Sequence, residues 1–369
     1  MGIWQRAIRL WGEGAKMHIK DYLEKVRPQV DAEIEKILPR TIDDAWLEWF
    51  LDKPQFRYPT EAVSQSVAVP IWDFLDRGGK RWRPGLMLLA CEATGGDAKR
   101  AMAFSPLVEL VHNGTIMADD LEDNSTTRRG KPCTHLIFGN DIAINDSNIM
   151  YFLPLILLYR NTQKLDEGTR IRIYDLYGQE MIRVSAGQAM DIIWHKGSNF
   201  TISEEEYLQM ALCKTGVLAR FSAKLGAILG NANARQEEAL AQFGATIGVA
   251  FQIQDDILNL VGEEFMKGKG VGEDIHEGKR TLIVIRALKQ LRPHDLDRLW
   301  QIIKSHPEDE KTILEAIGII QKTDGVDYAR QKSRELVQDA WKKLEPTLLP
   351  SEAKNTLKDF ADYLIERKI

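Results

Sequence analysis

Two apolar helical stretches that each end in acidic residues constrain this chain most strongly. The first, residues 107–130, places Asp119 and Asp123 one turn apart, and a later stretch ends in Asp255 and Asp256. On a helix, positions i and i+4 share a face, about 6 Å apart along the axis. Like charges repel by ~1 kcal/mol at 4 Å in water, and by ~4 kcal/mol at an effective dielectric of 20. A fold that keeps both pairs beside apolar helices therefore favours cations between them.

The chemistry of these clusters indicates a metal-bridged phosphate site. Carboxylate oxygens with access to water suit Mg²⁺, particularly where a substrate phosphate completes the coordination. Basic residues follow both clusters, namely Arg128, Arg129, Lys267, Lys269 and Lys279. Metal ions and basic groups beside carboxylates are typical of polyphosphate sites. A single acidic cluster would fit a solvated turn equally well. The presence of a second acidic cluster, at Asp255 and Asp256, favours the metal site.

A basic segment at residues 76–84, DRGGKRWRP, predicts an anion site. Its glycines let the backbone approach a ligand, and basic residues fill three of the next four positions. Pro84 fits the first position of the helix expected over residues 85–93, and helix N-termini favour anions. The alternative for this segment alone is a plain basic loop.

Helical periodicity runs through the chain, and no stretch alternates convincingly as a strand does. We expect helices over residues 18–38, 63–75, 97–118, 142–160, 170–194, 235–260, 280–291, 295–304, 309–321, 325–344 and 351–367. Thr201 and Glu204 predict a capping box at the start of a further helix. Residues 39–62 predict an ordered connection or a short helix. The class is all-α, a single large helical bundle.

Composition excludes several classes of protein. The chain has 369 residues and a net charge of −5, which does not favour binding to nucleic acid. Its three cysteines form no CxxC pair, which fits a reducing compartment and a cytoplasmic location. Its seven histidines form no zinc pattern. Because no linker divides residues 18–369, we expect them to form one domain.

Residues 1–17 are expected to form an N-terminal extension. Trp4 and Trp11, with arginines between them, break any apolar core of a signal peptide. Their helical spacing fits either a short helix on a membrane surface or one docked on the protein. The longest apolar run, residues 149–159, contains Pro154 and is too short to span a membrane.

His112, Lys214 and the loop at residues 262–278 each allow a structural and a functional interpretation. His112 lies two turns before Asp119 on the same face, and alone it would be a core histidine. Lys214, followed by Thr215, either extends to solvent or reaches an anion in a cavity. Residues 262–278, rich in glycine and lysine, are either a flap over phosphate or a surface loop.

Six segments, taken in order, resemble the signatures of the trans-isoprenyl diphosphate synthases. They are GGKRWRP (78–84), ELVHNGTIMADDLEDNSTTRRGKP (109–132), GQAMD (187–191), KTG (214–216), FQIQDDILN (251–259) and GKGVGEDIHEGKRTL (268–282). The resemblance runs from about residue 18 to the C-terminus and is strongest to geranylgeranyl diphosphate synthases. It implies an isoprenoid-synthase bundle with a central cavity. The implied reaction is head-to-tail condensation of isopentenyl diphosphate with dimethylallyl, geranyl or farnesyl diphosphate.

The resemblance also implies roles for individual residues. Asp119 and Asp123 would bind two Mg²⁺ ions, and Asp255 would help to bind a third. The residues implied on the allylic diphosphate are Arg128, Lys214, Gln252, Lys269 and Lys279. Those implied on isopentenyl diphosphate are Lys80, Arg83, His112 and Arg129. Thr215 and Gln252 would stabilise the allylic cation, and the chain is expected to form a homodimer or a higher homo-oligomer.

Product length, by the same resemblance, depends on residues below the first acidic cluster. Gly114 and Thr115 are small where farnesyl synthases carry aromatic residues, so we expect an open floor. Tyr151 and Phe152 would form the next barrier, and Ser185 is smaller than the histidine that eukaryotic enzymes tend to have. The expected product is geranylgeranyl diphosphate, with a 25-carbon product or farnesyl diphosphate as alternatives.

Two other classes of protein share parts of this pattern. A terpene cyclase would usually carry an NSE-type second metal site and would need no second diphosphate site, and Asp255 and Asp256 argue against it. A catalytically silent partner subunit would have lost an acidic cluster or the basic segment, and this chain keeps all of them. Asn259 replaces an aspartate that many members of the family carry, but it leaves both aspartates of the second pair in place.

Overall fold

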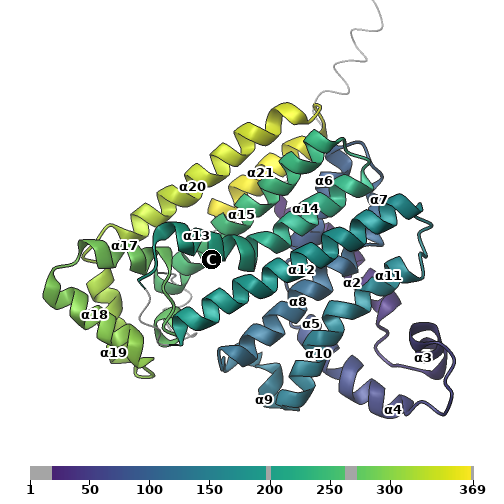
Figure 1. Cartoon of the computed structure of the whole chain (residues 1–369), viewed down its shortest axis with the longest axis horizontal. Coiled ribbons are helices and arrows are strands. Elements are labelled where there is room, and N and C mark those ends of the chain that lie inside the picture. Colours follow the sequence, from purple (N-terminus) through teal and green to yellow (C-terminus); the bar gives the residue numbers. More distant parts are fainter. Residues whose placement is uncertain (1–18, 197–200, 262–271, 367–369) are drawn as a thin grey trace, which may run out of the picture.

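The computed structural model describes residues 19–196, 201–261 and 272–366, and it confirms the all-α class (Figure 1). The expected extension, residues 1–17, lies outside this part, as do Lys267 and Lys269. The elements of the first half are α2 (Ile19–Ile37), α3 (Asp44–Leu51), α4 (Thr60–Val63), η1 (Ser64–Ala68), α5 (Val69–Asp76), α6 (Trp82–Ala93), α7 (Ala98–Met102), α8 (Ser105–Glu122), β1 (Thr127–Arg128), β2 (Lys131–Pro132), α9 (Thr134–Phe138), α10 (Asn140–Phe152), η2 (Leu153–Leu155), α11 (Ile156–Tyr159) and α12 (Glu167–His195).

The second half of the chain is also helical. Its elements are α13 (Glu204–Ala211), η3 (Leu212–Gly216), α14 (Val217–Leu229), α15 (Ala234–Val261), α16 (Glu273–His276), α17 (Leu282–Gln290), α18 (Pro293–Ser305), α19 (Glu310–Ile320), α20 (Gly325–Leu344), η5 (Glu345–Thr347) and α21 (Glu352–Glu366). Helix α15 packs against both α14 and α20, α14 packs against α6, and α8 packs against α10. This arrangement places the ends of α8 and α15 beside the same space.

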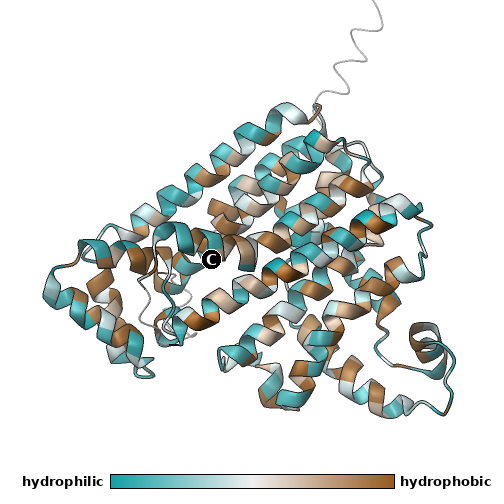
Figure 2. Cartoon of the chain, viewed as in Figure 1, coloured by the Kyte–Doolittle hydropathy of each residue, from teal (hydrophilic) through white to brown (hydrophobic). Residues whose placement is uncertain are grey.

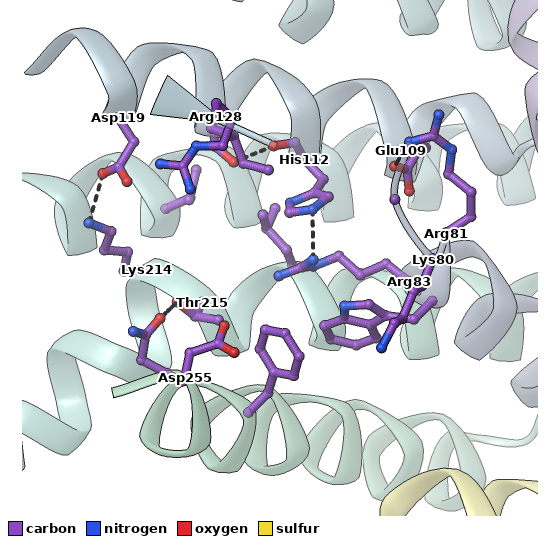
Figure 3. A pocket seen from close by; sticks show the side chains of 18 of the residues that line it. Lys80, Arg81, Arg83, Glu109, His112, Asp119, Arg128, Lys214, Thr215 and Asp255 are labelled. Carbon is purple, nitrogen blue, oxygen red and sulfur yellow. Dashed lines mark hydrogen bonds and ion pairs between the residues drawn. The ribbon is translucent and has the colours of Figure 1, made fainter. Parts of the chain in front are cut away.

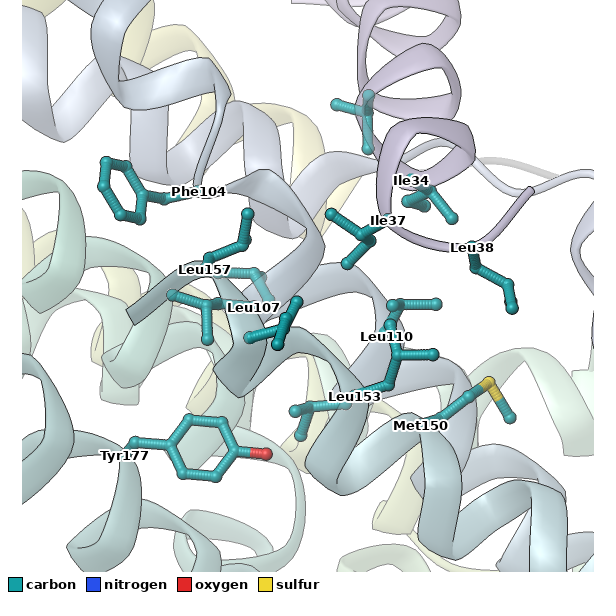
Figure 4. Packing of buried hydrophobic residues seen from close by; sticks show 14 of the residues in the cluster. Ile34, Ile37, Leu38, Phe104, Leu107, Leu110, Met150, Leu153, Leu157 and Tyr177 are labelled. Carbon is teal, nitrogen blue, oxygen red and sulfur yellow. The ribbon is translucent and has the colours of Figure 1, made fainter. Parts of the chain in front are cut away.

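Apolar side chains from distant parts of the sequence form the core around that space. Figure 4 shows Ile34 of α2, Leu110 of α8, Met150 of α10 and Tyr177 of α12 in one cluster. Each fully buried aliphatic or aromatic side chain contributes about 1.5–3 kcal/mol relative to an exposed one. The outer helix α20 is largely hydrophilic in Figure 2, as expected for a helix with one face in solvent.

Several predicted element boundaries were wrong. Helix α6 begins at Trp82, so Pro84 is its third residue and not its first. The capping box lies at Ser203 and Glu206, two residues later than predicted, because α13 begins at Glu204. The helix predicted over residues 142–160 is interrupted by η2, which contains Pro154. Proline lacks the N–H that a continuous helix requires, which explains that interruption.

One described stretch, Asn140–Tyr159, is long and apolar enough to cross a membrane by length and composition. Half of it, 50%, is buried inside the protein. Its first part, α10, packs against α8, and Met150 is 1% exposed. The apolar character of the stretch is therefore explained by its place in the core.

Candidate active site

Most of the acidic and basic residues singled out in the sequence line one large cavity, but Asp123 and Lys279 are not among the residues that line it. Its volume is about 1810 Å³. Its walls come from α2, α6 and the loop that precedes it, α8, the β1–β2 hairpin, α10, α12, η3, α14, α15 and α21. Figure 3 shows Asp119 on α8 and Asp255 on α15 pointing into the cavity from opposite sides, with Lys80 and Arg83 toward its other end. The cavity thus has an acidic end and a basic end.

Lys214 is paired with two carboxylates at the acidic end. Its Nζ donates to Asp119 Oδ1 at 2.8 Å and to Asp191 Oδ2 at 2.6 Å. Burial acts to raise the pKa of Asp119, but the charges of Lys214 and Lys279 outweigh it and hold that pKa below its usual value. Burial likewise acts to lower the pKa of Lys214, and Asp119 and Asp191 more than offset it. Both groups are therefore charged at neutral pH.

The backbone around Lys214 explains why the lysine faces inward. Residues Leu212–Gly216 form a π-helical turn between α13 and α14, and such turns often occur at functional sites. A Cβ added at Gly187 of α12 would lie 2.4 Å from the backbone nitrogen of Lys214. Only glycine lets α12 approach this turn so closely. The next residue, Gln188, donates from Nε2 to Asp119 Oδ1 at 2.7 Å.

Asp123 directly follows the last residue of α8 and contacts a second lysine. Lys279 Nζ donates to Asp123 Oδ2 at 3.0 Å, and it also pairs with Glu277. Burial acts to lower the pKa of Lys279, but Glu277 and Asp123 outweigh it and raise that pKa. His195 Nε2 lies 3.6 Å from Asp123 Oδ1. Lys279 therefore contacts the first acidic motif through Asp123, and its implied place on the allylic diphosphate stays a prediction.

In each aspartate pair, one carboxylate faces the cavity and its neighbour is buried. Asp120 is 1% exposed and accepts from Arg128 Nε at 2.7 Å. Asp256 is 4% exposed and accepts from Tyr207 Oη at 2.6 Å. Burial raises the pKa of Asp256 to about 6, although hydrogen bonds from Tyr207 and Gln252 act to lower it. These inner aspartates hold the cavity wall in place.

The basic end is assembled from the segment at residues 76–84 and from α8. Arg83 Nη1 lies 2.9 Å from His112 Nε2. Burial, followed by the charges of Arg83 and Arg129, lowers the pKa of His112, so the imidazole is neutral and accepts from Arg83. Burial lowers the pKa of Arg83 to about 10, which leaves it charged at neutral pH. Lys80 Nζ donates to Tyr363 Oη at 2.9 Å.

Arg129 lies at the basic end of the cavity, whereas Arg81 is buried in ion pairs with carboxylates. Arg129 lines the cavity from the β1–β2 hairpin, and its Nη1 donates to the Gly78 carbonyl at 2.5 Å. Arg81 is 3% exposed and donates to Asp31 at 2.8 Å and to Glu109 at 3.0 Å. Its charge is therefore matched by carboxylates, and it fixes the loop that carries Lys80.

The residues predicted to set product length have different positions. Thr115, Tyr151 and Ser185 line the cavity. Gly114 faces α10 instead, where an added Cβ would lie 2.9 Å from the Tyr151 ring and 3.0 Å from the Ser147 carbonyl. Phe152 is 67% exposed and does not line this cavity. Gly114 and Phe152 are thus not among the residues that line the cavity, unlike Thr115, Tyr151 and Ser185, and their roles in setting product length stay predictions.

The donor set at the acidic end fits a hard divalent cation. Asp119 is held ionised, Asp255 lines the cavity, and Asp123 Oδ1 is buried and accepts no hydrogen bond within the described residues. No three acidic, histidine or cysteine side chains converge on one point in the described part of the chain. The protein therefore offers part of each coordination sphere, and diphosphate oxygens and water would supply the rest.

Some residues of the site were not among those predicted. Gln188 and Asp191 contact Asp119 and Lys214, and the sequence offered a signal for them in the GQAMD segment. Tyr207 and Tyr363 reach the site from α13 and α21. Neither tyrosine lies in one of the six segments that carry the resemblance, so the sequence offers no comparable signal for them.

Comparison with known proteins agrees with this geometry. Residues 64–320 match the family described as polyprenyl synthetase. The short chain isoprenyl diphosphate synthase of Methanothermobacter thermautotrophicus is 35% identical over 79% of this chain and 87% of that protein. The geranylgeranyl diphosphate synthase of Saccharolobus solfataricus is 32% identical over 79% of this chain and 87% of that protein. The crystal structure of geranylgeranyl pyrophosphate synthetase from Pyrococcus horikoshii has a TM-score of 0.79 at 29% identity, and covers 94% of this chain and 98% of that one.

The helical bundle and its two-ended cavity define an isoprenyl synthase. The family match and the relatives together show that this chain belongs to the polyprenyl synthetase family. The resemblance drawn from the sequence motifs is thereby confirmed, and the chain is a trans-prenyltransferase.

Proposed function

We propose that this prenyltransferase extends an allylic diphosphate with isopentenyl diphosphate and releases geranylgeranyl diphosphate as its main product. The observation that carries the proposal is the single cavity with Asp119, Asp255 and Lys214 at one end and Arg83 and Arg129 at the other. Two diphosphates, one at each end, would lie with their hydrocarbon parts in the same space. A head-to-tail condensation requires that arrangement.

The residues at the acidic end would bind the allylic diphosphate as the leaving group. Lys214, Lys279 and Arg128 supply positive charge where negative charge accumulates when the C–O bond breaks. The oxygens of Thr215 and Gln252, which line the cavity, would stabilise the allylic cation. The double bond of isopentenyl diphosphate then attacks, and the released diphosphate takes the proton. No side-chain base is required.

Prenyl diphosphate synthases generally use divalent metal ions. We infer three Mg²⁺ ions, with Asp119 and Asp123 holding two and Asp255 helping to hold the third. When bound, the ions neutralise charge on the departing diphosphate.

The residues at the basic end would hold isopentenyl diphosphate without metal. Arg83, Arg129 and Lys80 supply the charge, and neutral His112 orients Arg83. Burial strengthens each of these interactions because little solvent screens them.

Product length follows from the cavity wall below Asp119. Of the residues predicted to set product length, Thr115, Tyr151 and Ser185 line the cavity, and Tyr151 is the only large one of these three. A 20-carbon product is therefore proposed, and a 25-carbon or a 15-carbon product is the alternative. Incubation with Mg²⁺, isopentenyl diphosphate and farnesyl diphosphate, followed by mass analysis, tests the proposal. A 20-carbon diphosphate would support the proposal. A longer product would support the condensation reaction but would mean that the residues that limit product length lie deeper in the cavity.

An apolar stripe on α12 supports a homodimer. Ile171, Ile182 and Ile193 recur every three turns and are 49%, 73% and 51% exposed. Apolar residues repeated on one exposed helix face are typical of interfaces. Ile182→Lys is expected to yield monomers in light scattering, and an unchanged mass would contradict this interface.

We also propose a cytoplasmic location. Cys91, Cys133 and Cys213 are free thiols, and burial raises the pKa values of Cys91 and Cys133 to about 12. Free thiols suit a reducing compartment. Localisation of a fluorescent fusion of the full chain tests this proposal.

A further inference from the structure

A chain of hydrogen bonds connects Tyr207, a buried residue of helix α13, with the wall of the cavity. Tyr207 Oη donates to Asp256 Oδ2 at 2.6 Å. Gln252 Nε2 donates to the other oxygen, Asp256 Oδ1, at 2.9 Å, and Thr215 Oγ1 donates to Gln252 Oε1 at 2.7 Å. Tyr207 and Asp256 are 2% and 4% exposed, whereas Thr215 and Gln252 line the cavity.

This chain fixes which end of the Gln252 amide faces the cavity. An ionised carboxylate only accepts hydrogen bonds, so the NH₂ group of Gln252 must turn toward Asp256. The carbonyl oxygen is then turned toward Thr215. A flipped amide would place a carbonyl oxygen against the carboxylate and an NH₂ group at the cavity wall. The two orientations present opposite partial charges to a substrate.

Asp256 can fix the orientation of the Gln252 amide only while the Asp256 carboxylate is itself kept in one orientation. The phenol of Tyr207 is the donor to Oδ2, and both side chains are buried where water cannot easily replace that bond. A buried acceptor that loses its donor costs about 1–3 kcal/mol. Without the phenol, the Asp256 carboxylate is expected to rotate, and its hydrogen bond with the Gln252 amide would then change.

We propose that Tyr207 is a positioning residue of the condensation. Acting through Asp256, it keeps the carbonyl oxygen of Gln252 aimed at the allylic carbon that becomes positively charged. A fixed dipole stabilises developing charge without reorganising during the reaction. This inference rests on the proposed function, because it requires an allylic cation at this wall.

Tyr207→Phe tests the proposal, and the chain contains a matched control. Tyr328 Oη also donates to a carboxylate, Glu204 Oε2, at 2.6 Å, but Tyr328 does not line the cavity. Tyr207→Phe is expected to lower kcat about tenfold, which is less than the loss of a direct oxyanion-type donor. The KM values for both diphosphates should stay within about twofold, and Tyr328→Phe should match the wild type.

A double-mutant cycle separates positioning from a structural role. If Tyr207 acts through Gln252, then adding Tyr207→Phe to Gln252→Leu should lower kcat no further. Multiplied losses, or an unchanged kcat in Tyr207→Phe, would overturn the proposal. If Tyr207→Phe fails to fold by circular dichroism, Asp256→Asn replaces it in the same cycle, with the same expected non-additivity. A wild type that elongates no allylic diphosphate would instead contradict the proposed function itself.

Discussion

The ammonium group of Lys214 lies 2.8 Å from a carboxylate oxygen of Asp119. The lysine comes from a π-helical turn and the aspartate from the end of α8, and the two positions are far apart in the sequence. Each group keeps the other charged in a buried site. In the proposed function, a diphosphate with its metal ions would offer both groups a new partner, the phosphate oxygens for Lys214 and a cation for Asp119.

Removal of the lysine charge should therefore affect the chemical step most. Lys214→Gln is expected to lower kcat by about 10²–10³-fold, the usual loss when one electrostatic contact to a leaving group is removed. Lys224→Gln is the control, since Lys224 pairs with Glu237 and does not line the cavity. Steady-state rates with farnesyl diphosphate measure both variants. A Lys214→Gln enzyme that keeps wild-type kcat would rule out this role.

Arg83 should influence one substrate and not the other. Arg83→Ala removes a buried charge at the basic end, so the KM for isopentenyl diphosphate should rise by about 10–100-fold, the equivalent of 1.4–2.8 kcal/mol. The KM for the allylic diphosphate should change little. Arg298→Ala, which removes an exposed pair with Glu315, serves as the control. Equal increases in both KM values would contradict separate diphosphate sites.

Thr115 and Gly114 are adjacent but should respond differently to phenylalanine. Thr115 lines the cavity, so Thr115→Phe is expected to shorten the product to farnesyl diphosphate. Gly114 faces α10, so Gly114→Phe should destabilise the protein by ~1–3 kcal/mol or more through overpacking. Product masses and thermal melting separate these effects. A Thr115→Phe enzyme with the wild-type product would mean that the chain grows along another wall.

The contrast between these neighbours shows what the sequence could and could not predict. The helices and both acidic motifs were predictable, because apolar periodicity and charge are local properties of the chain. The direction of Gly114 was not, because it depends on how α8 packs against α10. Tyr207 was missed for a related reason, since its partner Asp256 is distant in the sequence and the contact is buried.

Asp146 should make stability depend on pH. It is 0% exposed, burial raises its pKa to about 8, and neither carboxyl oxygen has a hydrogen-bond partner among the described residues. Because the folded pKa exceeds the unfolded one, this contribution to stability is complete below about pH 4 and is lost as pH rises toward 8.

Replacement by a neutral residue should remove that dependence. Relative to Asp146→Asn, the free energy of unfolding of the wild type should fall by on the order of 1 kcal/mol per pH unit between pH 5 and pH 7. Urea denaturation at both pH values measures the difference. Asp141→Asn, at an exposed position on the same helix, is the control. Parallel pH profiles for the wild type and Asp146→Asn would show that the buried carboxyl is already compensated.

The central claim is that one cavity holds two diphosphate sites, of which only the acidic one depends on metal. Calorimetric titration of the full chain, with Mg²⁺ or with EDTA, tests it most directly. In EDTA, isopentenyl diphosphate should bind once per chain, and Arg83→Ala should weaken that binding. A non-ionisable thiolo analogue of farnesyl diphosphate should bind only with Mg²⁺. Loss of isopentenyl diphosphate binding in EDTA, or metal-independent binding of the analogue, would contradict the assignment of the two ends.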